Sequence, residues 1–207
     1  MSTPDTKQKI LDASLLLFNE NGIVNVRLQQ IADESGISVG NLAYHFNTKE
    51  AITESLIGSV IEFLRDLLRQ YGKYPSLLDL QFFFKEFYRL YTLYSFFSCD
   101  ILEIKRNYPG AYDHLQPLFN KMKLQLERRL DLYLQQRLLV KESDSRNMAA
   151  NIWLLMLFMP AERHLNEERL VTENAYLRRL WEYLQPYLSP KGQTEFGTLI
   201  EPELRGR

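Results

Sequence analysis

The sequence is poor in cysteine, in glycine and in net charge, and each shortage excludes a class of protein. A single cysteine, Cys99, excludes an internal disulfide framework and any zinc site built from several thiolates. With 25 basic and 26 acidic side chains the net charge is −1, which excludes a generally basic nucleic-acid coat protein but is compatible with a local binding site. Only nine glycines occur, and no stretch alternates apolar and polar residues long enough to form a core strand. We therefore expect an all-α fold.

Long apolar runs are missing as well. The longest, from Ile152 to Met159, falls far short of the roughly 20 residues that cross a bilayer. Near the N-terminus Asp5 and Asp12 interrupt the only early apolar stretch, so no signal peptide is expected. We therefore expect a soluble, cytoplasmic protein without a membrane partner.

Helical periodicity and a large apolar content are what the sequence does have. Of its 207 residues 45% are apolar and 13% aromatic, which is enough for a sizeable core. Apolar residues recur at helical spacing almost throughout and predict about nine helices. The breaks in this pattern, of which Lys73 and Tyr74 mark the clearest, predict a three-helix domain, a connecting helix, a larger helical domain and a C-terminal tail over residues 1–50, 51–74, 75–188 and 189–207.

Two short helices near the N-terminus have the pattern of a helix-turn-helix motif. An apolar face from Leu28 to Ala32 marks the first helix, which ends at Gly36. Ser38 is placed to cap the second helix, which ends near His45. In this motif the second helix lies in the major groove of DNA and presents its first residues to base edges.

Polar side chains gather on the second short helix. Asn41 and His45 lie one helical turn apart and share a face, and the hydroxyl of the neighbouring Tyr44 can reach a phosphate. Lys49 adds a positive charge at the start of the next helix, beside backbone N–H groups that already favour anions. A three-helix domain without DNA binding is the alternative interpretation.

An ordered set of short motifs runs from Gly22 to Ile52. Its members are Ile31-Ala32, Gly36-Ile37-Ser38, Gly40-Asn41-Leu42, Tyr44-His45-Phe46 and Thr48-Lys49-Glu50. In order and spacing this set resembles the DNA-binding segment of the TetR family of bacterial transcription regulators. The resemblance implies phosphate contacts by Tyr44, His45, Thr48 and Lys49, and an approach to bases by Val39, Gly40 and Asn41. With their neighbours, the expected DNA-contacting residues are Arg27, Ser38, Val39, Gly40, Asn41, Tyr44, His45, Thr48 and Lys49.

Three positions depart from the family pattern. Ala43 replaces a common tyrosine, Val39 replaces a frequent lysine, and Arg27 stands where a serine or threonine usually caps the helix. The first fifty residues contain four basic and six acidic side chains. Each missing cationic contact lowers the salt dependence of DNA binding by roughly one unit of slope, so weak non-specific binding is expected.

No catalytic, metal or cofactor site is expected. Residues 36–40 satisfy the G-x-S-x-G pattern of a hydrolase nucleophile elbow, but that motif needs a strand before its serine, and here the preceding pattern is helical. The three histidines, His45, His114 and His164, show no spacing typical of zinc ligands. We therefore predict that the protein is not an enzyme and holds neither a metal nor a cofactor.

An aromatic-rich segment between Phe82 and Phe97 is the candidate ligand site. Four of its side chains share a helix face at spacings of four, four and three residues. The resemblance implies a ligand pocket in the larger domain, and this composition favours a small apolar or aromatic ligand. A packed aromatic core is the alternative. The candidate ligand-binding residues are Phe83, Phe87, Tyr91, Tyr94, Cys99, Trp153 and Met156.

The last two long helices are the candidate dimer interface. The segment from Met148 to Met159 is apolar on nearly every face, so one side is expected to meet the core and another side a second chain. We expect a twofold homodimer through helices near residues 144–166 and 173–188. A helix buried within one chain is the alternative.

These observations lead to one functional hypothesis and one alternative. The hypothesis is a dimeric transcriptional repressor whose binding to a palindromic operator on double-stranded DNA is modulated by a small hydrophobic ligand. The alternative is a dimeric helical protein that binds a small molecule and has lost DNA binding.

Overall fold

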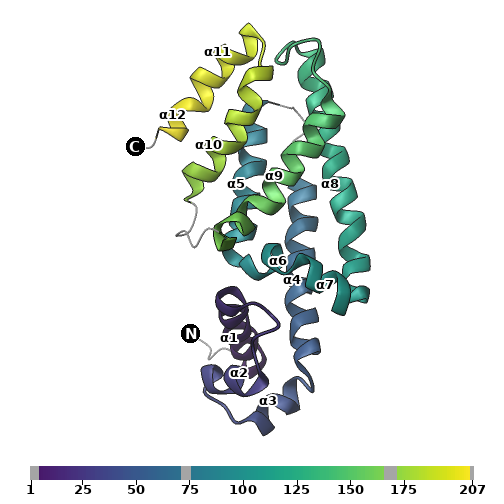
Figure 1. Cartoon of the computed structure of the whole chain (residues 1–207), viewed down its shortest axis with the longest axis vertical. Coiled ribbons are helices and arrows are strands. Elements are labelled where there is room, and N and C mark those ends of the chain that lie inside the picture. The colour runs from purple at the N-terminus through teal and green to yellow at the C-terminus, as the bar shows by residue number, and fades with distance from the viewer. Residues whose placement is uncertain (1–4, 71–75, 166–171, 206–207) are drawn as a thin grey trace. The chain divides into compact units, whose positions relative to one another are not determined.

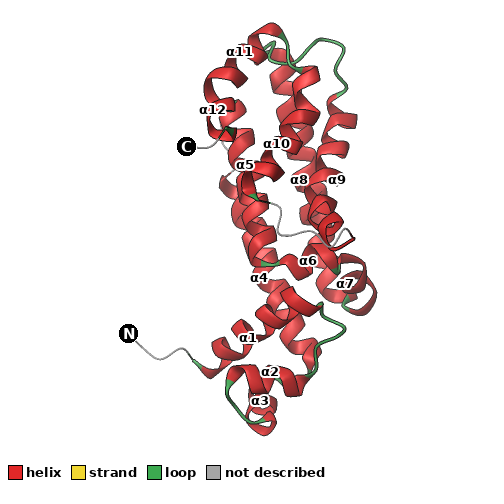
Figure 2. Ribbon diagram, turned by 60° about the vertical axis from the view of Figure 1, so that its left-hand side comes forward, coloured by secondary structure: helices red, strands yellow, loops and turns green. Residues whose placement is uncertain are grey.

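The structure, a computed structural model, describes residues 5–70, 76–165 and 172–205. Within these ranges the chain is helical, and the single β-type pairing described is an isolated bridge between Leu139 and Leu188 (Figures 1 and 2). The helices are α1 (Thr6–Asn21), α2 (Leu28–Ser35), α3 (Val39–His45), α4 (Lys49–Gln70), α5 (Leu77–Leu93), α6 (Ser95–Cys99), α7 (Ile101–Asn107), α8 (Pro109–Gln135), α9 (Ser145–Leu165), α10 (Glu173–Leu184), η1 (Gln185–Tyr187), α11 (Pro190–Leu199) and α12 (Glu201–Leu204). The all-α prediction is confirmed.

The described helices are more numerous than the predicted nine because several of them are short. The segment after α5 forms two brief helices, α6 and α7, in place of one. Two more, α11 and α12, fall where a tail was expected. The predicted break at Lys73 and Tyr74 lies outside the described residues.

The chain divides into two compact units. The first comprises residues 1–64 and 93–116, and the second comprises residues 65–92 and 117–207. The division falls inside α4 and α8, so each of these helices contributes residues to both units. Each unit is described by itself below.

In the first unit, local hydrogen bonds set the ends of the two short helices. Gly36 takes a left-handed conformation with φ +68° and ends α2, and the Ser38 Oγ accepts a hydrogen bond from the Asn41 N–H at 3.1 Å. At the start of α2 the Arg27 N–H donates to the Gln30 side chain at 2.8 Å. Gln30 therefore satisfies the backbone N–H of the residue that precedes α2, as the glutamine of a capping box does.

In the second unit, α5, α8, α9 and α10 pack as a bundle. The buried Trp181 of α10 donates its indole N–H to the Gln81 side chain of α5 at 2.5 Å. Tyr176, also on α10, donates its hydroxyl to the Met156 carbonyl of α9 at 3.3 Å. Burial raises the pKa of Tyr176, so its hydroxyl stays protonated and remains a donor. These buried polar contacts fix α10 against two helices at once.

A partly buried ion pair joins α8 to α5 in the same bundle. The Arg129 guanidinium is 4% exposed and lies 3.2 Å from the Asp79 carboxylate. One helical turn further along α8, the Tyr133 hydroxyl donates to the Ser76 carbonyl at 2.5 Å. Both contacts hold the first turn of α5, which the Ser76 Oγ caps.

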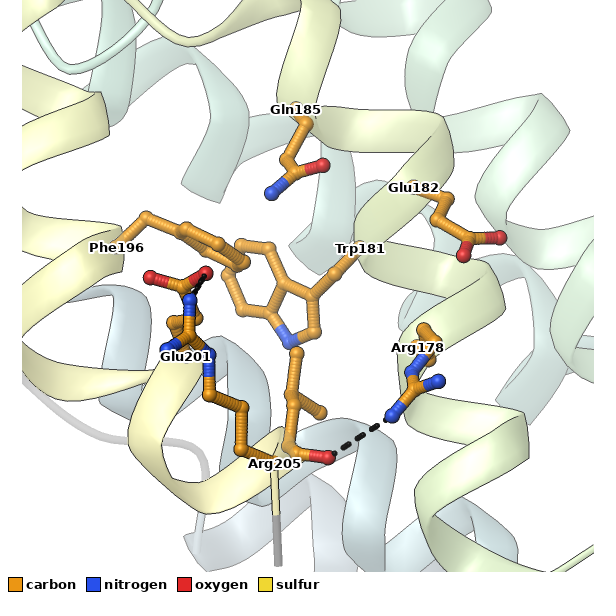
Figure 3. Close-up of a pocket in the computed structure, with 8 residues that line it drawn as sticks. Arg178, Trp181, Glu182, Gln185, Phe196, Glu201 and Arg205 are labelled. Carbon is orange, nitrogen blue, oxygen red and sulfur yellow. Dashed lines mark hydrogen bonds and ion pairs between the residues drawn. The ribbon is translucent and has the colours of Figure 1, made fainter.

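The C-terminal residues form two packed helices, which corrects the prediction of a tail over residues 189–207. Phe196 of α11 packs on the Trp181 ring at a centroid distance of 5.3 Å, and Leu204 of α12 is buried (Figure 3). The charged side chains beside them have partners within the chain: Arg205 pairs with Glu201 at 2.7 Å. Pro190 and Pro202 lie in the first turns of these helices, where a proline is well tolerated.

Gly192 of α11 shows why a glycine is needed in this helix. A Cβ atom at this position would lie 2.1 Å from the carbonyl oxygen of Leu138, which follows α8. At Gly197, on the same helix, the nearest atom would be 4.0 Å away, on the Glu201 carboxylate. The close approach of α11 to the end of α8 therefore requires a glycine at the first position but not at the second.

Candidate nucleic-acid interface

The short helix α3 presents one buried side chain and a row of exposed ones. Leu42 is fully buried and anchors the helix, whereas Val39, Gly40 and Asn41 in its first turn are exposed. Tyr44 is 84% exposed, an unusual state for so large a side chain. The structure thus places the predicted base-reading residues together on one accessible surface.

The end of α3 and the start of α4 carry the other predicted contacts. The Tyr44 and His45 rings meet edge to face at a centroid distance of 5.2 Å, and His45 is half-buried. The Thr48 Oγ1 accepts a hydrogen bond from the Ala51 N–H at 3.2 Å, so this side chain caps α4. These residues form a polar edge beside the N-terminus of a long helix, where anions bind favourably.

Lys49 is turned toward the protein. Its ammonium group donates to the carbonyl oxygens of Ile23 and Val26 at 2.8 and 2.9 Å, and to that of Val24 at 3.5 Å. An ammonium group has three N–H donors, so these carbonyls match its hydrogen-bonding capacity. The side chain therefore holds the loop between α1 and α2 against the start of α4.

The opposite side of the same loop is held by Asp100, at the junction of α6 and α7. Its carboxylate accepts a hydrogen bond from the Ile23 N–H at 2.8 Å. Asn19, near the end of α1, donates to the Leu93 carbonyl at 3.0 Å and accepts from the Phe96 N–H at 3.1 Å. Sequence reasoning missed these contacts because partners more than seventy residues apart leave no local signal.

Two family models cover most of the chain. Residues 10–56 match the model described as "Bacterial regulatory proteins, tetR family", and residues 62–196 match the model described as "Bacterial transcriptional repressor". The chain belongs to the TetR family. The predicted resemblance, drawn from residues 22–52 alone, is confirmed and extends over both units.

Curated relatives of this TetR-family chain are transcriptional regulators. It is 34% identical over 105 residues to the HTH-type transcriptional regulator RutR of Escherichia coli K12, covering 51% of this chain and 43% of that protein. It is 28% identical over 109 residues to IcaR of Staphylococcus aureus strain Newman, the negative regulator of the biofilm operon icaADBC, covering 53% of each. The chain thus spans about half the length of the curated relatives it matches.

Solved structures share the fold over nearly the whole chain. A TetR-family regulator from Marinobacter aquaeolei VT8 superposes with a TM-score of 0.81 at 22% identity, covering 97% of this chain and 98% of the other. CprB from S. coelicolor A3(2) gives a TM-score of 0.74 at 18% identity, covering 98% of both chains. The predicted TetR-like architecture, an N-terminal helix-turn-helix followed by a larger helical region, is confirmed.

The seven predicted ligand-binding residues of this TetR-family chain are divided between the two units. Five of them, all buried, lie in the second unit: Phe83, Phe87, Tyr91, Trp153 and Met156. The Phe87 and Trp153 rings meet edge to face at 5.6 Å, which is the geometry of a packed aromatic core. Tyr94 and Cys99 belong to the first unit, where Tyr94 packs on Phe96 at 6.5 Å. Sequence spacing found the buried aromatic face but could not separate packing from ligand binding.

Of the two helices predicted to form a dimer, α9 keeps an apolar outer face. On α9, Leu154 is 52% and Phe158 43% exposed, although its opposite face is buried in the bundle. Beside them Asn151 donates to the Tyr183 hydroxyl of α10 at 3.0 Å. The last residue of the predicted segment 144–166 lies outside the described ranges. Among the described helices, α9 included, none has the length and apolar content to cross a membrane.

Proposed function

We propose that this chain is a DNA-binding transcriptional repressor that acts as a homodimer on a palindromic operator. The observation that carries the proposal is the exposed face of α3, which Ser38 caps and the buried Leu42 anchors. A helix held in this way can enter the major groove with its first turn leading. A regulator of genomic DNA works in the bacterial cytoplasm, and this is where we expect the protein to act.

The residues of this face divide into two roles. Val39, Gly40 and Asn41 are proposed to approach base edges. At Gly40 a Cβ atom would lie 3.9 Å from its nearest neighbour, the Ser38 Oγ, so the exposed backbone leaves room for a close approach. Tyr44, with its hydroxyl exposed, is proposed to contact a phosphate.

Arg27, Ser38, His45 and Thr48 complete the proposed phosphate contacts at the edges of this face. For Lys49 we propose a supporting role through the loop between α1 and α2, because its ammonium group is turned toward three carbonyl oxygens. Five side chains, Tyr44 included, are thus proposed to contact phosphates, and Lys49 is proposed as a support in place of the phosphate contact that the resemblance implied.

Dimerisation is proposed to bury the outer faces of α9 and α10. Two exposed apolar side chains one helical turn apart, Leu154 and Phe158, give α9 the stripe that a four-helix interface needs. An isologous pair of such faces relates two copies of α3 by a twofold axis, as a palindrome requires.

Ligand control is proposed to act through the aromatic core of the second unit. A small apolar or aromatic molecule that enters between Phe87 and Trp153 would have to separate rings that now touch. It would therefore favour a different arrangement of the bundle, and it would release DNA only by its differential affinity for the two arrangements.

The alternative, a small-molecule-binding protein that has lost DNA binding, is not favoured. The family model for the DNA-binding segment matches residues 10–56, and the α3 face is accessible. We propose no catalytic activity: the serine of the G-x-S-x-G pattern, Ser38, uses its hydroxyl to cap a helix.

A salt-titrated selection of genomic DNA fragments by the purified protein tests the proposal. Recovery of a palindromic site is expected, and Asn41→Ala should relax discrimination at one base pair of each half-site, by about 1–3 kcal/mol. Tyr44→Phe should weaken binding to all sequences alike, and Thr198→Ala, on an exposed position of α11, is the matched control. No selected site at low salt, from a folded dimer, would overturn the proposal in favour of the DNA-silent alternative.

A further inference from the structure

A cationic cavity lies between α4 and α8 in the second unit. Its volume is about 400 Å³, within the range of small-molecule sites. Its lining consists of four basic side chains, three leucines and Gln125. Three features of this lining point to one class of ligand.

The charges of the lining are all of one sign. Arg65, Arg69, Lys121 and Arg128 are exposed and carry positive charge, and the lining contains no acidic side chain. Of these, Arg69 pairs with Asp66 on its own helix. Cations gathered around one concave surface raise the local concentration of an anion.

The floor of the cavity is apolar. Leu118 is buried, Leu68 is half-buried and Leu124 is 44% exposed, although all three sit among charged neighbours. A free phosphate or sulfate ion gains nothing from such a floor. An anion that carries an apolar body can bury the leucine surface while its head stays with the arginines.

Gln125 supplies the third feature. Its side-chain oxygen is buried and accepts no hydrogen bond from any residue that the structure describes. A buried acceptor without a donor is costly, and Gln125 lines the cavity, so a rotation of its amide that brings the oxygen to a ligand donor gains the whole contact. A cationic surface that only attracts phosphate groups needs no hydrogen-bond acceptor. The unpaired Gln125 oxygen therefore favours a ligand that carries a hydrogen-bond donor.

We propose that this cavity is a binding site for a small amphipathic anion, with an anionic head, an apolar body and a hydroxyl donor. The head lies against Lys121 and Arg128, the body lies on the three leucines, and the hydroxyl donates to the Gln125 oxygen. The site is separate from the aromatic core of the same unit, because the two share no side chain. The proposal does not rest on the proposed DNA binding.

Isothermal titration calorimetry of the full chain with three probes tests the site. The probes are 4-phenylbutyrate, its methyl ester, which is neutral and has no hydrogen-bond donor, and 4-(4-hydroxyphenyl)butyrate. The carboxylate should bind and the ester should not, and the phenol should bind about fivefold more tightly than 4-phenylbutyrate because its hydroxyl can pair with Gln125. Inorganic sulfate, which has charge without an apolar body, should not compete at equal concentration.

Variants assign the binding to this cavity. Lys121→Gln with Arg128→Gln should weaken binding of 4-phenylbutyrate about tenfold, whereas Lys123→Gln, an exposed lysine of α8 outside the lining, should leave it unchanged. Gln125→Leu should remove the advantage of the phenol and keep the binding of 4-phenylbutyrate.

Three results would overturn the proposal. Equal binding of the carboxylate and its methyl ester would show that the charges take no part. Binding to vesicles that contain anionic lipid, without binding of either free carboxylate, would assign the surface to a membrane. Loss of DNA affinity in the Lys121→Gln/Arg128→Gln variant, again without carboxylate binding, would assign it to nucleic acid.

Discussion

Replacement of Lys49 by methionine tests whether this lysine supports DNA binding by holding the loop between α1 and α2 or by contacting a phosphate. Methionine keeps the length and apolar character of the side chain and removes its charge and its donors. The carbonyls of Ile23 and Val26, which now accept at 2.8 and 2.9 Å, would lose their partner. The loop between α1 and α2 would then be held from one side only, by Asp100.

The expected loss of stability follows from these two short contacts. A hydrogen bond to a charged group contributes about 1.5–3 kcal/mol, and Lys49 is half-buried, so the two together should cost about 3 kcal/mol when removed. For a chain of this size each kcal/mol lowers Tm by about 2–4 °C, which predicts a fall of about 6–12 °C. Differential scanning calorimetry measures it, with Lys9→Met, an exposed lysine of α1, as the control.

DNA binding provides the second measurement. Because the ammonium group faces carbonyls, the slope of log K against log salt should be the same for Lys49→Met and the native protein, even where affinity falls. A phosphate contact would instead lower the slope by about 0.9 for each half-site. A normal Tm combined with a reduced slope would refute the reasoning, because Lys49 would then be a phosphate ligand and not a support.

Three further predictions concern the second unit and the interfaces. Gly192→Ala should lower the free energy of unfolding by about 2–3 kcal/mol in urea denaturation because its Cβ meets a carbonyl oxygen, whereas Gly197→Ala should raise it by up to about 1 kcal/mol. Leu154→Glu should shift the protein toward the monomer in analytical ultracentrifugation, and Leu102→Glu, at an equally exposed leucine of α7, should not. Burial raises the pKa of Tyr176, so stability should be unchanged below about pH 10, where unfolded tyrosine is neutral, and should decline above it by up to about 1.4 kcal/mol per pH unit. Tyr176→Phe should remove that part of the decline, and an identical alkaline titration of the two proteins would contradict the assignment.

Sequence spacing predicts those parts of this fold that depend on neighbours along the chain. The cap at Ser38 and the end of α2 at Gly36 involve residues within a few positions of one another, and both were predicted. The exposed face of α3 follows from the same local pattern, since the buried Leu42 fixes which side turns outward.

Contacts between distant segments could not be predicted in this way. Lys49 looked like a phosphate ligand because its carbonyl partners lie more than twenty residues earlier and carry no side-chain signature. Asp100 likewise has no local signal of its role, because its carboxylate accepts from the Ile23 N–H, 77 positions away.

The C-terminal helices were missed for a related reason. Their proline and glycine content is typical of a tail, and only the tertiary partners of Phe196 and Gly192 turn those residues into packed helices. The composition of a segment indicates its local conformational preference, whereas its burial depends on contacts with residues elsewhere in the chain.

The hydrogen bond from the Leu77 N–H to the Glu195 side chain, at 3.0 Å, has a consequence for biosynthesis. The two residues are 118 positions apart, so at about 5–20 residues per second the ribosome needs roughly 6–24 s to deliver Glu195 after Leu77. Throughout that interval the first turn of α5 lacks this partner. After its own synthesis, the Trp181 ring also lacks its contact with Phe196 until the ribosome has added that residue. The nascent bundle therefore exposes aromatic surface until its last helices leave the exit tunnel, and this late stage is when it most needs the protection of a chaperone.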